Sequence, residues 1–149
     1  MVVSANRQFT IEATPEKILD VILDVEALPE WSGAHHDATV LERDGHGRPL
    51  RSMSTMRMAG LTDEQVLEYV YPDSGFGWRL VSSRHLKKQD ATYTLTPDGT
   101  RTQVKLHLIV ESAVPIPGFI MKRVVQAVVN TATDDLTKRV RTVQDRPAH

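Results

Sequence analysis

The densest group of titratable side chains in the sequence is His35-His36-Asp37. An imidazole titrates near neutral pH, so we expect His35 or His36 to act as a general acid or base if this segment borders a cavity. Adjacent residues of an extended segment point in opposite directions, which disfavours chelation of one metal ion by both histidines. The remaining histidines show no HxxxH or HxH spacing, and we therefore predict no metal site.

Other catalytic signatures are absent from the sequence. It contains no cysteine, no GxSxG nucleophile motif, no GxGxxG fingerprint and no P-loop. This pattern excludes thiol catalysis and argues against the commonest dinucleotide and nucleotide sites. The formal net charge is −1, from 18 Lys and Arg against 19 Asp and Glu, which gives no general attraction to nucleic acid. We predict no cofactor and no nucleic-acid partner.

Targeting and membrane signals are also missing. The N-terminus has no basic segment followed by an apolar run. No apolar run approaches the roughly 18 residues that a transmembrane helix needs. We expect a cytoplasmic protein without integral membrane association. The 149 residues predict one domain over residues 1–149, with 146–149 as a frayed tail, and leave the oligomeric state open.

Hydrophobic periodicity predicts seven strands and, at the C-terminal end, one long helix. Apolar and polar residues alternate over seven segments, at residues 3–13, 38–44, 50–58, 63–71, 76–83, 87–96 and 102–112. Thr14-Pro15-Glu16 is typical of a helix N-terminus and predicts a short helix or helix pair after the first strand. Residues 119–143 lack Gly and Pro and carry apolar residues three and four apart, which predicts one long amphipathic helix.

These elements predict an α+β fold. Short connections rich in turn residues make neighbouring strands antiparallel. A seven-stranded sheet twists and curls, and the long C-terminal helix is the element large enough to cover its apolar face. A curled sheet around a straight helix does not fill its interior evenly. We therefore expect a cavity between sheet and helix, with a solid core as the alternative.

Several motifs, in their order along the chain, resemble the Bet v 1-like or START-like (SRPBCC) helix-grip superfamily. They are Thr14-Pro15-Glu16, Leu28-Pro29-Glu30-Trp31, the run from Tyr93 to Thr100 that leads into Thr102-Gln103-Val104, and Val114-Pro115-Ile116-Pro117-Gly118-Phe119. Within it the chain looks most like the bacterial polyketide cyclase/dehydrase and lipid-transport group, over about residues 3–144. The resemblance implies a seven-stranded helix-grip fold and a ligand pocket between sheet and helix. The superfamily contains carriers, cyclases, hydrolases and protein-binding members, so the fold does not choose among these functions.

Side chains that share a strand face predict the lining of this pocket. The inward sets on three strands supply Trp78, Leu80, Tyr93, Leu95, Leu106 and Leu108. The resemblance implies that Met121, Val125 and Val128 of the terminal helix close the pocket. Arg57 lies among methionines in a strand and is interpreted either as a solvated residue or as a partner for an anionic ligand head.

The strand at residues 63–71 has two possible inner faces. One set contains Leu67, Tyr69 and Tyr71, and the other contains Val66, Glu68 and Val70. The volume of the two tyrosines favours the first set, but both remain open at this point.

Three functions compete. The first is binding of a small hydrophobic molecule, such as a lipid-, polyketide- or isoprenoid-like compound, oriented by Tyr69, Tyr93, Arg57 or His35. The second is a cyclase or aromatase that promotes aldol closure and loss of water with acid and base groups from Glu68, Asp90, His36 and Tyr93. The third is a protein-interaction module, which an exposed apolar patch on the terminal helix or on segment 31–37 would favour.

Overall fold

The computed structural model describes residues 2–145; the predicted tail, 146–149, lies outside this range. The first strand, β1 (Val2–Ile11), is followed by α1 (Pro15–Leu23), the 3-10 turn η1 (Val25–Ala27) and α2 (Leu28–Trp31). Six strands follow: β2 (His35–Arg43), β3 (Pro49–Met58), β4 (Leu61–Val70), β5 (Gly75–Ser82), β6 (Leu86–Asp98) and β7 (Arg101–Ser112). The C-terminal helix comprises α3 (Gly118–Asn130), the π segment η2 (Thr131–Asp135) and α4 (Leu136–Gln144).

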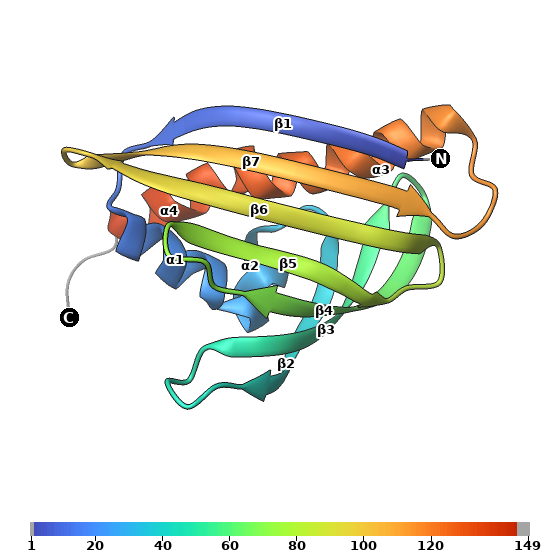
Figure 1. The fold of residues 1–149 in the computed structure, drawn as a ribbon, viewed down its shortest axis with the longest axis horizontal. Helices are drawn as coiled ribbons and strands as arrows, with labels where there is room; N and C mark the ends of the chain where they lie inside the picture. The colour runs from blue at the N-terminus through green and yellow to red at the C-terminus, as the bar shows by residue number, and fades with distance from the viewer. Residues whose placement is uncertain (1, 146–149) are drawn as a thin grey trace.

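The predicted sheet is confirmed. Its seven strands are antiparallel and lie in the order β1-β7-β6-β5-β4-β3-β2, so that consecutive strands are neighbours except at β1. Figure 1 shows the sheet curving from β1 to β2, with the C-terminal helix running behind β7 and β6. Helix α3 contacts both β1 and β3, which belong to opposite halves of the sheet. The sheet therefore curls around the helix, as the helix-grip arrangement requires.

The sequence signals for the first helix act as predicted. The Thr14 hydroxyl accepts a hydrogen bond from the Lys17 amide at 3.4 Å, and Pro15 occupies the first helical turn. One face of α1 is buried through Ile18 and Val21. The single helix predicted for residues 119–143 is confirmed in extent, but it contains the π segment η2, which the sequence analysis did not predict.

The main core lies between β7 and the C-terminal helix. Alternate residues of β7, Val104, Leu106, Leu108 and Val110, are at most 2% exposed. On the helix, Met121 and Val124 are equally buried. Burial of each such side chain stabilises the fold by about 1.5–3 kcal/mol relative to full exposure. These residues belong to one hydrophobic core cluster and do not line the cavity described below.

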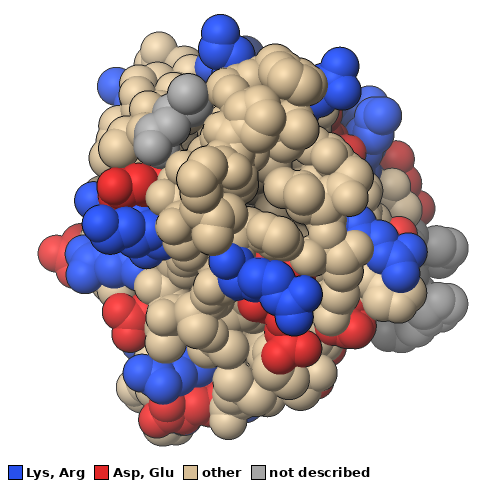
Figure 2. Space-filling model, turned by 90° about the vertical axis from the view of Figure 1, so that its right-hand side faces the viewer, with Lys and Arg blue, Asp and Glu red and all other residues tan. Residues whose placement is uncertain are grey.

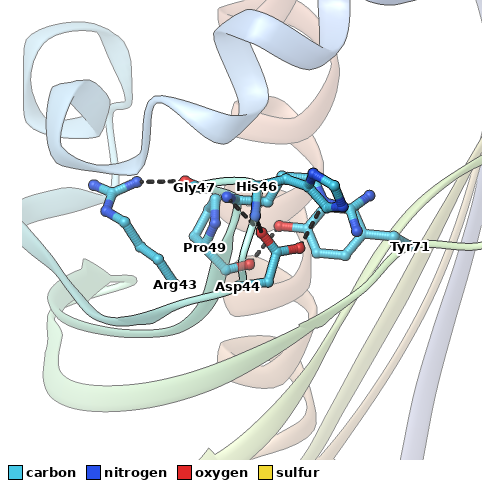
Figure 3. Close-up of polar contacts among 7 residues, drawn as sticks. Arg43, Asp44, His46, Gly47, Pro49 and Tyr71 are labelled. Atoms are coloured by element: carbon cyan, nitrogen blue, oxygen red, sulfur yellow. Dashed lines mark hydrogen bonds and ion pairs between the residues drawn. The ribbon is translucent and has the colours of Figure 1, made fainter.

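The β2–β3 turn is held by a compact group of polar contacts (Figure 3). The Asp44 carboxylate accepts hydrogen bonds from the His46 and Arg48 amides at 2.9 Å and from Arg48 Nε at 2.8 Å. The Arg48 guanidinium lies over the Tyr71 ring, 4.2 Å from its centroid, and the Tyr71 hydroxyl donates to the Pro49 carbonyl. Slight burial raises the pKa of Asp44, but the hydrogen bonds from Arg48 and His46 outweigh it and hold this pKa below its ordinary value.

Candidate functional site

A cavity of about 80 Å³ lies between the other half of the sheet, the π segment and the helices that follow β1. Most of the residues around it are apolar or aromatic. Its lining comprises Ile22, Val25, Leu28, Trp31, His35, Ser52, Ser54, Met56, Gln65, Leu67, Tyr69, Phe76, Trp78, Gln89, Tyr93, Val128, Thr131, Ala132 and Leu136. This volume holds several water molecules and is smaller than the roughly 300–1,000 Å³ typical of pockets for drug-sized ligands.

One wall of the cavity is an aromatic cluster built from three adjacent strands. Tyr69 from β4 stacks on Phe76 from β5 with ring centroids 5.4 Å apart. The ring centroid of Trp78, also from β5, lies 5.8 Å from that of Tyr93, which comes from β6. Such aromatic pairs contribute about 0.5–1.5 kcal/mol each beyond the burial of their area. The rings therefore form a continuous aromatic surface that faces the cavity.

Gly75 allows β5 to approach β6 closely beside this wall. A Cβ atom at Gly75 would lie 1.8 Å from the Tyr93 carbonyl oxygen, and Gly75 pairs with Thr94 in the sheet. No other residue fits at this position, because the atom it would meet belongs to the backbone.

Tyr93 connects the aromatic wall to the C-terminal helix. Its hydroxyl donates a 2.7 Å hydrogen bond to the carbonyl of Ala132, inside the π segment. Within a π segment the hydrogen bonds run from residue i to i+5, which disturbs the α-helical pattern of backbone partners. Burial raises the pKa of Tyr93 far above that of a free phenol, so the group is a neutral donor.

A chain of hydrogen-bonded side chains links the cavity edge to the same π segment. His35 Nδ1 lies 2.6 Å from the Ser32 hydroxyl, which lies 3.3 Å from the Thr131 hydroxyl. Thr131 in turn donates to Asp135 at 3.5 Å, and Asp135 also accepts from the Gly33 amide at 3.0 Å. Burial lowers the pKa of His35 to about 4. The imidazole at the cavity edge is therefore uncharged at neutral pH.

A second polar group enters the cavity from β3, β4 and β6. Ser54 and Gln65 are opposite each other in the β3–β4 pair, and Gln89 donates to the Gln65 side-chain oxygen at 3.2 Å. Gln65 donates to Asp63 at 3.1 Å, and Asp63 also accepts from the Ser83 hydroxyl and, at 2.9 Å, from the Arg84 amide. Nearer the aromatic wall, the Ser52 and Tyr69 hydroxyls lie 2.5 Å apart.

Five of the predicted ligand-binding residues line this cavity. They are His35, Tyr69, Trp78, Tyr93 and Val128. The alternative left open for β4 is settled by burial: Leu67 and Tyr69 are buried toward the helix, and Glu68 lies on the opposite face. There Glu68 stands opposite Arg51 of β3 and Arg79 of β5 in the strand register.

The other predicted residues lie elsewhere. The residues that pack in or against the main core, and do not line the cavity, are Leu80, Leu95, Leu106, Leu108, Met121 and Val125. The terminal helix is long, and α3 also contacts β1, which does not line the cavity, so burial on the inner face did not by itself place a residue at the cavity.

The polar candidates that remain lie on the outer surface. Arg57 is exposed because its neighbours Met56 and Met58 take the inner face of β3. Asp90 alternates with buried Gln89 and Ala91, points outward and pairs with Lys88 at 3.7 Å. His36 is exposed, whereas its neighbour His35 lines the cavity. Among the four groups considered for the cyclase, only Tyr93 reaches the cavity, and His35, the other predicted acid or base, also lines it.

Sequence analysis missed the neutral polar residues of the lining. Ser52 and Ser54 share the parity of Met56 and Met58 on β3, and Gln65 shares that of Leu67 and Tyr69 on β4. Strand parity therefore carried a signal for all three, once the inner faces of β3 and β4 were known. Gln89 has the parity of Ala91 and Tyr93 and was within reach of the same argument.

A second hollow, of about 350 Å³, lies between α1 and α4. Charged and polar residues form much of its lining, including Lys17, Asp20, Asp24 and Arg139. It is a surface groove of mixed charge, without the aromatic wall of the first cavity.

Within residues 2–145 no three His, Asp or Glu side chains converge in a way that would hold a metal ion. None of the helices described here has the length and hydropathy for a membrane crossing.

Exposed apolar side chains gather near the β7–α3 connection. Val114 and Phe119 are 42% and 63% exposed. Figure 2 shows this end of the molecule, where uncharged residues form a broad area with charged residues mostly at its borders. Segment 31–37, the other place considered for an apolar patch, exposes Gly33, His36 and Asp37 instead.

Solved structures with the same fold span nearly the whole chain. A START superfamily protein from Mycobacterium smegmatis has a TM-score of 0.84 at 23% identity, covering 94% of this chain and 98% of its own. A protein from Thermus thermophilus has a TM-score of 0.77 at 21% identity, covering 95% and 99%. An aromatase/cyclase from a Streptomyces species has a TM-score of 0.79 at 13% identity, covering 95% and 94%.

These likenesses establish the helix-grip fold, and no curated protein matches the sequence. The family model described as "Polyketide cyclase / dehydrase and lipid transport" matches residues 2–143. With fold, cavity and sequence match in agreement, the chain belongs to the polyketide cyclase/dehydrase and lipid-transport family.

Proposed function

We propose that this protein binds a small, largely apolar molecule in the cavity between β3–β6 and the C-terminal helix. The observation that carries the proposal is the cavity itself, with its aromatic wall of Tyr69, Phe76, Trp78 and Tyr93. Burial of apolar ligand surface there contributes roughly 25 cal/mol per Å² before the costs of association. A one-ring ligand suits the present volume best.

Larger ligands require the lining to move. Met56, on β3, is an unbranched and flexible side chain that adapts to different shapes. Leu28 and Trp31 come from α2, a helix of four residues none of which is fully buried. These residues are where the cavity widens most readily for a lipid- or polyketide-sized molecule.

A cyclase or aromatase function has one observation in its favour. His35 lines the cavity and is held through Ser32 and Thr131 by the hydrogen-bonded chain that ends at Asp135. A pKa of about 4 makes this imidazole a weak base, and within residues 2–145 no Asp, Glu, Lys or Arg lines the cavity with it. Paired acid–base catalysis is therefore less well supported than binding, and a His35→Gln variant that retained full turnover of a polyketide mimic would remove it.

The binding proposal is tested by filling the cavity. Isothermal titration calorimetry measures the affinity of 4-ethyltoluene, an uncharged one-ring probe, for the unmodified chain and two variants. Ala132→Leu adds volume at a buried lining position, whereas Ala113→Leu adds the same volume at an exposed loop position. We expect binding to weaken at least tenfold in Ala132→Leu and to be unchanged in Ala113→Leu.

Near-ultraviolet circular dichroism confirms that both variants keep their tertiary structure. Equal affinity in the two variants, or no heat of binding for the unmodified chain up to the solubility of the probe, would contradict the proposal.

A further inference from the structure

Two buried polar side chains in the cavity have hydrogen-bonding capacity that the protein does not use. Ser54 lines the cavity and is 3% exposed. Its hydroxyl makes no hydrogen bond to any residue between 2 and 145. Gln89 is 2% exposed, and its side-chain nitrogen donates to Gln65, but its side-chain oxygen has no partner in that part of the chain. Among the described residues no fully enclosed side-chain nitrogen or oxygen lacks a partner, so these two unpaired groups face the cavity space, where a ligand atom or water can complete them.

The orientation of these groups is fixed from behind. Asp63 is 2% exposed. It accepts hydrogen bonds from the side-chain amide of Gln65, the hydroxyl of Ser83 and the backbone amide of Arg84. Because Gln65 donates to this carboxylate, its oxygen is turned toward Gln89 and receives the Gln89 amide proton. The Gln89 oxygen is then the acceptor at the open end of the chain.

The electrostatics of this end of the cavity favour a neutral ligand that donates a hydrogen bond. Among the described residues no Lys or Arg lines the cavity, and the His35 imidazole is uncharged at neutral pH. The charged group that contacts these polar side chains is the Asp63 carboxylate, which accepts from the lining residue Gln65. An anionic ligand head would lose its hydration here without gaining a cation, which is strongly unfavourable.

We propose that Ser54 and Gln89 bind the hydroxyl group of an uncharged ligand, an alcohol or a phenol, whose apolar body packs on the aromatic wall. The ligand hydroxyl donates to the Gln89 oxygen and accepts from the Ser54 hydroxyl. This inference rests on the proposed binding function and adds the chemical class of the ligand. It distinguishes a hydroxylated molecule from a fatty acid, whose carboxylate the same site rejects.

A matched series of probes with one apolar body tests the proposal. Calorimetry compares 4-ethylphenol with 4-ethyltoluene, in which a methyl group replaces the hydroxyl, and with 4-ethylbenzoate, which carries a charge. A single hydrogen bond contributes about 0.5–1.5 kcal/mol, or roughly 2- to 13-fold in affinity. We expect 4-ethylphenol to bind five- to tenfold more tightly than 4-ethyltoluene, and 4-ethylbenzoate to bind at least tenfold more weakly than 4-ethylphenol.

Substitution of Ser54 assigns the preference to this site. In Ser54→Ala the ratio of the affinities for 4-ethylphenol and 4-ethyltoluene should fall at least threefold, while the affinity for 4-ethyltoluene stays within twofold. Ser82→Ala is the matched control, because Ser82 is exposed at the end of β5 and does not line the cavity. It should leave both affinities unchanged.

The outcomes separate the two proposals. If 4-ethyltoluene binds in the cavity but 4-ethylphenol binds no better, or if Ser54→Ala leaves their ratio unchanged, the hydroxyl site is wrong and cavity binding stands. Binding of 4-ethylbenzoate as tight as that of 4-ethylphenol also overturns the hydroxyl site. If none of the three probes binds, the binding function falls and this inference falls with it.

Discussion

The β2–β3 turn and the cavity end formed by Ser54, Gln65 and Gln89 are both polar clusters, but they are built in opposite ways. In the turn, Asp44 and Arg48 are four residues apart, carry full charges and satisfy each other and their own backbone. In the cavity, the three side chains come from three strands, are neutral, and keep an acceptor and a hydroxyl open. The turn holds the chain in shape, whereas the cavity cluster has capacity for something outside the chain.

The difference teaches where function lies in this fold. A local, charged and fully satisfied cluster is stable in solvent and needs no partner. A buried cluster assembled from distant residues is costly unless a ligand or water completes it. Three expected effects sharpen this contrast, beginning with the largest.

The cavity wall should tolerate added volume far less than the turn. In Gly75→Ala the new methyl group would meet the Tyr93 backbone oxygen, so β5 must separate from β6. We expect the free energy of unfolding to fall by about 3 kcal/mol or more. In Gly45→Ala, where nothing lies within 4 Å of the added atom, the change should stay within about 0.5 kcal/mol. Urea denaturation measures both, and similar values for the two variants would refute the close approach of β5 and β6.

The two carboxylates at the base of these clusters should also differ. Asp63→Asn places an amide where three donors converge in the interior, which leaves at least one buried donor unsatisfied. We expect a loss of about 2 kcal/mol in the free energy of unfolding. Asp44→Asn in the turn should cost less, because its donors turn to solvent. Equal losses in denaturant titrations of both variants would show that Asp63 is less constrained than its contacts indicate.

Acidification should weaken the fold through His35 before it affects Asp44. Below pH 6.5 the unfolded chain takes up a proton at His35, but the folded protein does so only near its pKa of about 4. The free energy of unfolding should therefore fall by about 2 kcal/mol as the pH drops from 6.5 to 4. The lowered pKa of Asp44 places the loss of its contribution below pH 3.8, outside this interval.

His35→Gln removes this dependence, and His36→Gln, at an exposed neighbouring position, is the control that keeps it. Thermal unfolding at a series of pH values measures the slopes. A slope that survives in His35→Gln would assign the proton uptake to another group.

Most of the fold was predictable from the sequence because its signals are local. Period-two alternation, the turn residues and the Thr14-Pro15 helix start depend on neighbours within a few positions, and all seven strands and the long helix are confirmed. The observed β2 begins at His35 rather than at residue 38, and β6 begins at Leu86 rather than at residue 87.

The candidate site was less predictable because it depends on which stretch of the sheet the helix leaves uncovered. Leu106 and Tyr93 are both inward-facing, yet only Tyr93 reaches the cavity. Hydrophobic pattern distinguishes inside from outside, but not a filled interior from an empty one. For the same reason Glu68 and Asp90 were plausible acids until parity placed them outside.

The π segment η2 also explains a spacing in the C-terminal sequence. Val128, Ala132, Leu136 and Val140 are all buried and follow one another at intervals of four residues. In a regular helix of 3.6 residues per turn, three such steps would carry the last side chain about 120° around the axis. The wider turn at Thr131–Asp135 offsets most of that rotation. The π segment therefore rotates α4 about the helix axis relative to α3. As a result α3 keeps its contacts with the sheet, and α4 keeps its contacts with α1.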